Sequence, residues 1–213
     1  MQATRIIAVR HGETAWNVAT RIQGQLDIPL NARGQWQAAR VAAALATEPL
    51  DAVYASDLAR AWETGAAIAR AADRPIHAHS GLRERGFGSL QGQTFAEIEA
   101  AFPEESRRWR GRDPHWAPPG GESLIKLGER IGQTLDEIAA RHLGEQIVLV
   151  AHGGVLDVLY RMATGQEIQA PRTWNLGNAT INRLLWTPET LTLVGWADTR
   201  HLDEAAVLDE GAD

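Results

Sequence analysis

Two short apolar runs, each closed by a histidine–glycine pair, are the features that most constrain the fold of this chain. The first run, residues 6–9, leads into His11, and the second, residues 147–151, leads into His152. Apolar runs of four or five residues without polar alternation predict strands that are buried on both faces, as in a parallel sheet. The carboxyl ends of such strands open into the crevice where α/β proteins bind ligands. We therefore expect both histidines to lie at the ligand-binding edge of one sheet.

Strand-like and helix-like segments alternate along most of the chain. Apolar residues recur at helical spacing between the strand-like runs, and a Thr-Pro-Glu-Thr turn joins two further runs near the carboxyl end. This alternation predicts a mainly parallel sheet with helices on both faces. The predicted fold class is therefore α/β, a single three-layer α/β/α sandwich. The expected strands are 6–9, 52–55, 76–79, 147–151, 180–186 and 191–196, and the expected helices include residues 38–45, 58–72, 124–138 and the segment after His152.

The length and composition of the chain suit one domain. With 213 residues, 44% of them hydrophobic and 23% charged, the chain can bury a core of its own. We place the domain at residues 1–202 and an acidic tail at 203–213. Residues 103–121 are rich in proline, glycine and arginine, so we expect a lid-like insertion there. Of the eight tryptophans, Trp109 and Trp116 fall in this insertion, and we expect the others to pack in the core or at its rim.

Composition also limits the partners that fit. A net charge of −6 argues against a nucleic-acid binder, so a phosphate site would be a local positive pocket in an acidic protein. No apolar run approaches the length of a membrane span, and the amino-terminal segment lacks a secretory signal pattern. The absence of cysteine excludes disulfide and thiolate chemistry and agrees with a cytoplasmic protein.

Charged residues follow other predicted elements. Arg60 falls in the first turn of the helix expected at 58–72, whose start we expect Ser56 or Asp57 to cap. Like Arg10, which directly precedes His11, it is a permanent cation that can bind a phosphate through two parallel hydrogen bonds. Glu84 lies in a glycine-bounded loop. Two histidines, two arginines and one carboxylate at strand ends and loops are the set that phosphoryl transfer through histidine requires.

Two weaker features concern backbone shape and metal binding. Gly12 would permit a tight turn and a close approach of the backbone to a ligand. His77 and His79 stand two residues apart and could bind a metal ion together, but no third ligand lies nearby. We favour an ordinary strand there and expect no metal.

Four motifs follow one another along this chain. They are Arg-His-Gly-Glu-Thr with Trp-Asn at 10–17, Ser-x-Leu-x-Arg-Ala-x-x-Thr at 56–64, Leu-x-Glu-x-x-x-Gly-x-x-x-Gly at 82–92, and Ala-His-Gly at 151–153. In these motifs and their order the chain resembles the histidine phosphatase superfamily, which includes the cofactor-dependent phosphoglycerate mutases. The resemblance spans residues 5 to about 200 and implies a phosphoglycerate mutase-like fold.

The resemblance implies a role for each matched residue. His11 would be the nucleophile, Glu84 would serve as acid and then base, and His152 would complete the catalytic set. No metal and no cofactor are implied, and the partner would be a small phosphorylated metabolite bound by a monomer or a homodimer. Glu13 is expected to be structural. The implied phosphate-binding residues are Arg10, Arg60, Asn17 and His152, and the candidate substrate contacts are Thr14, Gln23, Gly24, Arg85, Arg110 and Gly153.

Three functions differ in the molecule that receives the phosphoryl group. Transfer to water would make the protein a metal-independent phosphatase, and transfer back to a bound sugar acid would make it a phosphoglycerate mutase. Without any transfer, the protein would be a module that only binds phosphorylated ligands. Three segments differ from those of the mutases. Glu-Arg-His-Tyr-Gly of the mutases is Glu-Arg-Gly-Phe-Gly here, Trp-Arg-Arg-Ser is Trp-Arg-Gly-Arg, and His-Gly-Asn is His-Gly-Gly. A lysine that the mutases carry downstream falls near Phe95 of this chain. These differences favour a phosphatase, and retention of nucleophile and acid disfavours the binding module. A sugar or aromatic phosphate, α-ribazole phosphate included, would suit the tryptophan-bearing insertion, and nothing in the sequence selects one.

Overall fold

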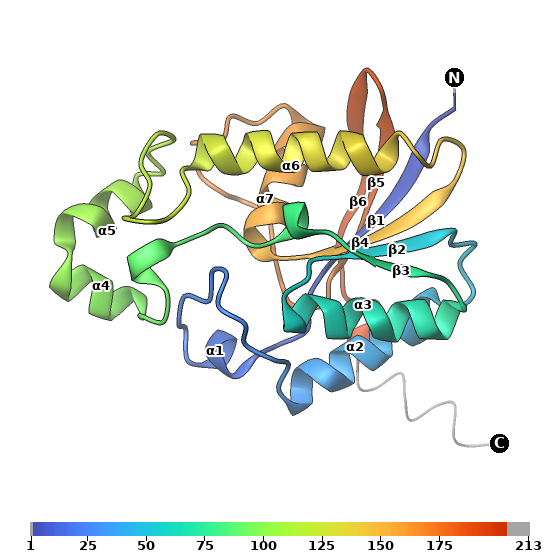
Figure 1. The fold of residues 1–213 in the computed structure, drawn as a ribbon, viewed down its shortest axis with the longest axis horizontal. Coiled ribbons are helices and arrows are strands. Elements are labelled where there is room, and N and C mark those ends of the chain that lie inside the picture. Colours follow the sequence, from blue (N-terminus) through green and yellow to red (C-terminus); the bar gives the residue numbers. More distant parts are fainter. Residues whose placement is uncertain (1, 204–213) are drawn as a thin grey trace.

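The computed structural model describes residues 2–203, and in this part of the chain six strands form one mixed sheet (Figure 1). The strand order is β3-β2-β4-β1-β5-β6. The first four strands in this order run parallel, and the last two form an antiparallel hairpin at one edge. The predicted mainly parallel α/β fold is confirmed. The strands are β1 (Thr4–Arg10), β2 (Ala52–Ala55), β3 (Ile76–Ala78), β4 (Gln146–Ala151), β5 (Ile181–Thr187) and β6 (Thr190–Asp198).

Helices cover both faces of this sheet, which explains the unbroken apolar run of its central strands. Ile6 and Ala8 of β1 pack with α6 and α7, whereas Ile7 and Val9 pack with α2 and α3. The two helix pairs lie above and below the sheet in Figure 1. Because successive side chains of a strand point to opposite faces, both sets must be apolar. The helices are α1 (Ala15–Val18), α2 (Ala32–Leu45), α3 (Ala59–Ala72), α4 (Phe95–Ala101), α5 (Pro103–Arg110), α6 (Leu124–Ala139) and α7 (Gly153–Thr164), with short 3₁₀ turns η1 (Ser80–Leu82), η2 (Gly88–Leu90) and η3 (Arg200–Leu202).

Residues 103–121, the predicted insertion, are more regular than their composition suggests. Residues 103–110 form helix α5, with Pro103 in the first turn, where a missing N–H costs nothing. Helix α4 precedes it, and the two helices project to one side of the sheet (Figure 1). A small apolar cluster joins this part to the loop after α1 through Ile22, Leu90, Ile98 and Trp116. The proposed end of the domain at residue 202 stays a prediction. Of the predicted acidic tail at 203–213, residues 204–213 lie outside the described residues.

The start of α3 is capped differently from the prediction. Neither Ser56 nor Asp57 is its N-cap residue, which is Leu58, without a side-chain cap. Instead, Asp27 Oδ1 accepts a hydrogen bond from the backbone N–H of Ala59 at 2.7 Å. A carboxylate at a helix N-terminus satisfies a free amide and interacts favourably with the helix dipole. This contact ties the first turn of α3, which carries Arg60, to the loop that follows α1.

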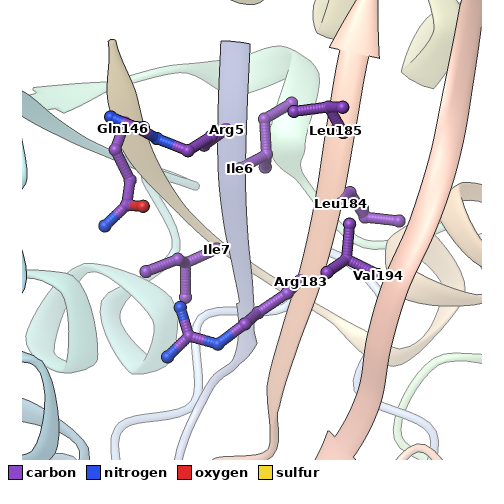
Figure 2. Close-up of a pocket in the computed structure, with 8 residues that line it drawn as sticks. All are labelled: Arg5, Ile6, Ile7, Gln146, Arg183, Leu184, Leu185 and Val194. Atoms are coloured by element: carbon purple, nitrogen blue, oxygen red, sulfur yellow. The ribbon is translucent and has the colours of Figure 1, made fainter. Parts of the chain in front are cut away.

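A cavity of about 190 Å³ lies on the sheet near the amino end of β1 (Figure 2). Residues 5–7 of β1 and 183–185 of β5 line it together with Gln146 and Val194. His11 follows the opposite end of β1, so this cavity is separate from the predicted site. Among residues 2–203, no helix is both long and apolar enough to span a membrane.

Candidate active site

His11 sits directly after β1 and is held by hydrogen bonds of its backbone and of its ring. Its N–H donates to the carbonyl of Ala151 at the end of β4 at 3.0 Å, and its own carbonyl accepts from Asn178 Nδ2 at 2.9 Å. The ring Nδ1 lies 2.7 Å from the carbonyl oxygen of Gly12. Because a carbonyl only accepts, Nδ1 must hold the proton, and the lone pair is on Nε2.

The surroundings of His11 keep this ring neutral. Burial is the largest cause that lowers the pKa of His11 well below that of a free imidazole, and the charges of Arg10 and Arg60 lower it further. The sequence alone indicated the effect of the two cations but not that of burial. A buried neutral imidazole with a free Nε2 lone pair is the form that can attack phosphorus.

His152 faces His11 across the ends of β1 and β4. The two ring centroids are 5.1 Å apart, and His152 is completely buried as the N-cap residue of α7. Burial lowers its pKa well below the usual value, and the charge of Arg60 adds to this effect. Neither of its ring nitrogens has a hydrogen-bond partner among the described residues.

Arg10 and Arg60 are held by backbone carbonyls that leave part of each guanidinium free. Arg60 donates to the carbonyls of Leu26 and Gly24 at 2.9 and 2.7 Å, and Arg10 donates to the carbonyl of Leu176. Burial lowers the pKa of Arg60 to about 10, so Arg60 remains cationic at neutral pH, and burial also lowers the pKa of Arg10. The Nε atoms of both arginines are buried without a partner in the described chain.

The unpartnered buried atoms are concentrated at this site. Buried donors without partners are rare and costly, so their clustering indicates a ligand-binding site. Among residues 2–203 six buried side-chain nitrogen or oxygen atoms lack a partner, and four of them belong to Arg10, Arg60 and His152. The other two belong to Asp157 and Trp174, which line the same cleft.

Glu84 completes the site from the loop after η1. Its carboxylate accepts hydrogen bonds from the N–H of Arg85 at 2.7 Å and from the N–H of Gly154 at 3.1 Å. The second contact places it at the N-terminus of α7, next to His152. A Cβ atom on residue 154 would collide with Glu84 Oε1, so this position requires glycine while Glu84 holds this place.

These groups open into a cleft of about 820 Å³. Such a volume is in the range of cavities that bind small molecules and exceeds what one phosphate needs. Arg10, His11, Arg60 and Glu84 line it, and the ring of His152, completely buried, contacts the ring of His11.

Of the candidate substrate contacts, five line this cleft: Gln23, Gly24, Arg85, Arg110 and Gly153. Arg85 is buried, donates to the carbonyls of Glu122 and Trp116, and has its pKa lowered to about 10 by burial. Arg110 is exposed and is paired with Glu99.

Thr14 and Asn17 have structural contacts of their own. They form a reciprocal capping box at the start of α1, in which Thr14 Oγ accepts from the N–H of Asn17 at 3.1 Å. Asn17 also lines the cleft, whereas Thr14 is completely buried and is not among the lining residues. Glu13 accepts a hydrogen bond from Asn31 Nδ2 at 2.8 Å, as expected for a structural residue.

The two weaker features of the sequence both have contacts within the fold. Gly12 is needed for close packing against the backbone of Gly34 in α2, because a Cβ there would collide with the Gly34 carbonyl, and its approach to a ligand stays a prediction. The strand expected at His77 is present as β3. His77 contacts the ring of Tyr54, and His79 lies outside β3 and accepts from the N–H of Gly81 at 3.1 Å. Among residues 2–203, no three His, Asp or Glu side chains are grouped so as to hold a metal ion.

Several residues in or next to the site were not predicted. Asn178 binds the backbone of His11, yet its short Asn-Leu-Gly-Asn segment carries no signal in the sequence. Trp16 and Trp174 line the cleft, although we expected only Trp109 and Trp116 outside the core and its rim. Trp116 is instead buried in the small cluster of the insertion. Arg172 also lines the cleft and was missed.

Known proteins share this fold over almost the whole chain. The family model for the histidine phosphatase superfamily (branch 1) matches residues 6–199. The "Phosphoglycerate mutase-like protein 4" of Arabidopsis thaliana is 39% identical over 97% of this chain and 90% of its own length. The "Metal-independent phosphoserine phosphatase" of the same plant is 38% identical over 100% of this chain and 89% of its own. A phosphoserine phosphatase of Entamoeba histolytica in complex with 3-phosphoglyceric acid is 29% identical, with a TM-score of 0.83 over 94% of this chain and 100% of that one.

The fold and the similarities together define the class of this protein. Its mainly parallel sheet presents histidines, arginines and a carboxylate at the strand ends, and phosphatases share this fold. These findings confirm the prediction of a phosphomonoester hydrolase. The chain belongs to the histidine phosphatase superfamily, branch 1.

Proposed function

We propose that this protein hydrolyses small phosphomonoesters through a phosphohistidine on His11, without a metal ion. The observation that supports this proposal most strongly is the set of buried, unpartnered nitrogen atoms on Arg10, Arg60 and His152 beside the free Nε2 of His11. We assign these nitrogen atoms to the oxygens of the transferred phosphoryl group, because preorganised donors of this kind stabilise developing charge without reorganisation. The cationic charge that a metal would supply comes here from arginines.

The reaction takes two displacements at phosphorus. The Nε2 lone pair of His11 forms the N–P bond while the P–O ester bond breaks, and Glu84 gives its proton to the departing oxygen. Water then attacks phosphorus and loses a proton to the Glu84 carboxylate, and the N–P bond breaks with its electron pair returning to Nε2. His152 and the two arginines hold the phosphoryl oxygens throughout. We assign Gln23, Gly24 and Gly153 to the substrate side of the same cleft, and Asn17 to its phosphate side.

Small phosphorylated acids are the substrates to test first. The solved phosphatase named above binds 3-phosphoglyceric acid, and the curated relative is named for phosphoserine. The decisive test is release of inorganic phosphate from a panel of small phosphomonoesters in the presence of a strong chelator. We expect release at an unchanged rate, and a complete dependence on added Mg²⁺ would contradict the proposal.

The mutase alternative is tested in the same assay. One relative carries a phosphoglycerate mutase-like name, so the alternative deserves a direct measurement. With 3-phosphoglycerate and a bisphosphate primer, we expect phosphate release without formation of the 2-isomer. Isomerisation faster than hydrolysis would make the protein a mutase.

A further inference from the structure

The cleft carries more positive charge than one phosphate requires. Arg10 and Arg60 hold the phosphoryl site, yet further arginines line the same cleft, and its lining carboxylates are Glu84 and Asp157. The whole chain has a net charge of −6, so this concentration is local. A cleft lined by one sign of charge attracts ligands of the opposite sign. The other lining arginines are Arg21, Arg85, Arg110, Arg112 and Arg172.

Most of these additional arginines already have partners. Arg85 donates to two carbonyls, and Arg112 pairs with Asp157 at 2.8 Å. Arg21 and Arg110 pair with the surface acids Glu97 and Glu99, respectively. Arg172 differs, because it is exposed at the cleft and has no hydrogen bond or ion pair with any residue in the described part of the chain.

The loop that carries Arg172 is anchored on both sides. Before it, Arg161 of α7 donates to the carbonyl of Ala170 at 2.8 Å. After it, the ring of Trp174 stacks on Tyr160 with centroids 4.1 Å apart. A surface loop with such anchors holds its side chains near one position, which lowers the entropic cost of binding.

The same loop is joined to the phosphoryl site. Arg10 donates to the carbonyl of Leu176, four residues after Arg172. Burial is the largest cause that lowers the pKa of Arg10 and of Arg112, and the carboxylates of Glu84 and Asp157 oppose it. The positive charge of Arg172 lowers both pKa values further. Like charges that face one cleft repel each other, and an anion bound between them removes this repulsion.

We propose that Arg172 binds a second anionic group of the substrate, so that the cleft selects phosphomonoesters that carry another negative charge beside the transferred phosphoryl group. This proposal rests on the proposed hydrolase activity. A carboxylate and a second phosphate share the chemistry that an arginine binds, since each presents two oxygens to the planar guanidinium. Arg172 is thus a specificity-determining residue, separate from the groups that carry out the chemistry.

Two matched substrate pairs test the proposal. 3-Phosphoglycerate and glycerol 3-phosphate differ in a carboxylate, and fructose 1,6-bisphosphate and fructose 6-phosphate differ in a phosphate. The ratio of kcat/KM within each pair is measured for the unmodified protein, Arg172→Gln and Arg172→Glu. Arg141, a paired and exposed arginine after α6 that does not line the cleft, provides the matched controls Arg141→Gln and Arg141→Glu.

We expect the unmodified protein to prefer the more anionic member of at least one pair. Arg172→Gln should reduce that preference about fivefold or more, the size expected for a hydrogen bond to a charged group near the surface, and Arg172→Glu should reduce it further. The pair that responds identifies the anion as carboxylate or phosphate. The Arg141 variants should retain the original ratios.

Failure of this proposal differs from failure of the proposed function. If the unmodified protein hydrolyses these esters but both ratios stay unchanged in both Arg172 variants, Arg172 binds no second anion. Equal losses in the Arg141 variants would also overturn the proposal, because the effect would then follow net charge alone. No phosphate release from any ester by the unmodified protein would instead contradict the hydrolase activity itself.

Discussion

The positively charged side chains at the two ends of the cleft differ in whether they have partners. At the strand ends, Arg10, Arg60 and His152 keep buried nitrogen atoms without partners. At the insertion end, arginines are already satisfied, as in the pairs of Arg110 with Glu99 and of Arg112 with Asp157. The difference shows that charge alone does not identify a ligand site. We propose that the reaction takes place beside the unpartnered buried nitrogen atoms of Arg10, Arg60 and His152, whereas Arg110 and Arg112 already have carboxylate partners.

The largest effect expected at the strand ends concerns the nucleophile. His11→Ala removes the only proposed acceptor of the phosphoryl group, so we expect turnover of every phosphomonoester to be abolished. Phosphate release is measured beside His115→Ala, a change of an exposed histidine that does not line the cleft. Full activity of His11→Ala would show that the strand-end part of the cleft does not carry out the reaction.

The next largest effect separates Glu84 from Glu13. An alkyl phosphate expels a poor leaving group, so Glu84→Gln should slow its hydrolysis by about 10²–10⁴-fold, the usual contribution of general acid catalysis. A nitrophenyl ester leaves as a stabilised phenolate, so formation of the phosphoenzyme from it should change little. Glu13→Gln is the control, because Glu13 contacts Asn31 instead. If Glu13→Gln shows the leaving-group dependence and Glu84→Gln does not, the acid has been assigned to the wrong residue.

Gly154 tests whether the position of Glu84 matters as much as its chemistry. Gly154→Ala places a Cβ against Glu84 Oε1 and forces the carboxylate away from the start of α7. Small displacements of a reacting group can cost roughly 10²-fold in rate, so we expect a loss of that order in kcat for alkyl esters. Gly132→Ala in α6, where the nearest atom would be 3.8 Å from the new Cβ, should keep full activity. Equal activity of the two variants would show that Glu84 need not sit on α7.

The smallest effect is on stability and follows from the two neutral histidines. Folding lowers the pKa of His11 and His152 below the unfolded value of about 6.5. Below that pH the unfolded chain therefore binds protons that the folded chain does not, and the free energy of unfolding falls as the pH falls. Each histidine contributes a slope of about 1.4 kcal/mol per pH unit in this window.

Urea unfolding between pH 7 and pH 5 measures this slope. His152→Asn should have a shallower slope than the unmodified protein, while His115→Asn should not differ from it. An identical slope in His152→Asn would mean that His152 is protonated in the folded state or that both states titrate alike.

The sequence predicted the strand-end half of the site better than the insertion half, and the reason is physical. Residues such as His11 and His152 follow apolar runs whose pattern identifies buried strands, so the parallel pairing of β1 with β4 brings them together. Asp27, Asn178 and Arg172 act through loops, where contacts depend on tertiary packing and leave no periodic pattern. The motif around Arg110 predicted a substrate contact, but its pairing with Glu99 could be seen only in the structure.

The form of the phosphoenzyme tests the central claim most directly. The Nδ1–H group of His11 donates a hydrogen bond to the Gly12 carbonyl, which leaves Nε2 as the proposed nucleophile. Rapid quenching during turnover of a nitrophenyl ester, under alkaline conditions that preserve phosphohistidine, followed by peptide mapping and ³¹P NMR, identifies both the residue and the nitrogen. Our account predicts one acid-labile phosphohistidine, on Nε2 of His11. Phosphorylation of His152 or of the Nδ1 atom of His11, or full turnover without any phosphoenzyme on the reaction time scale, would contradict it.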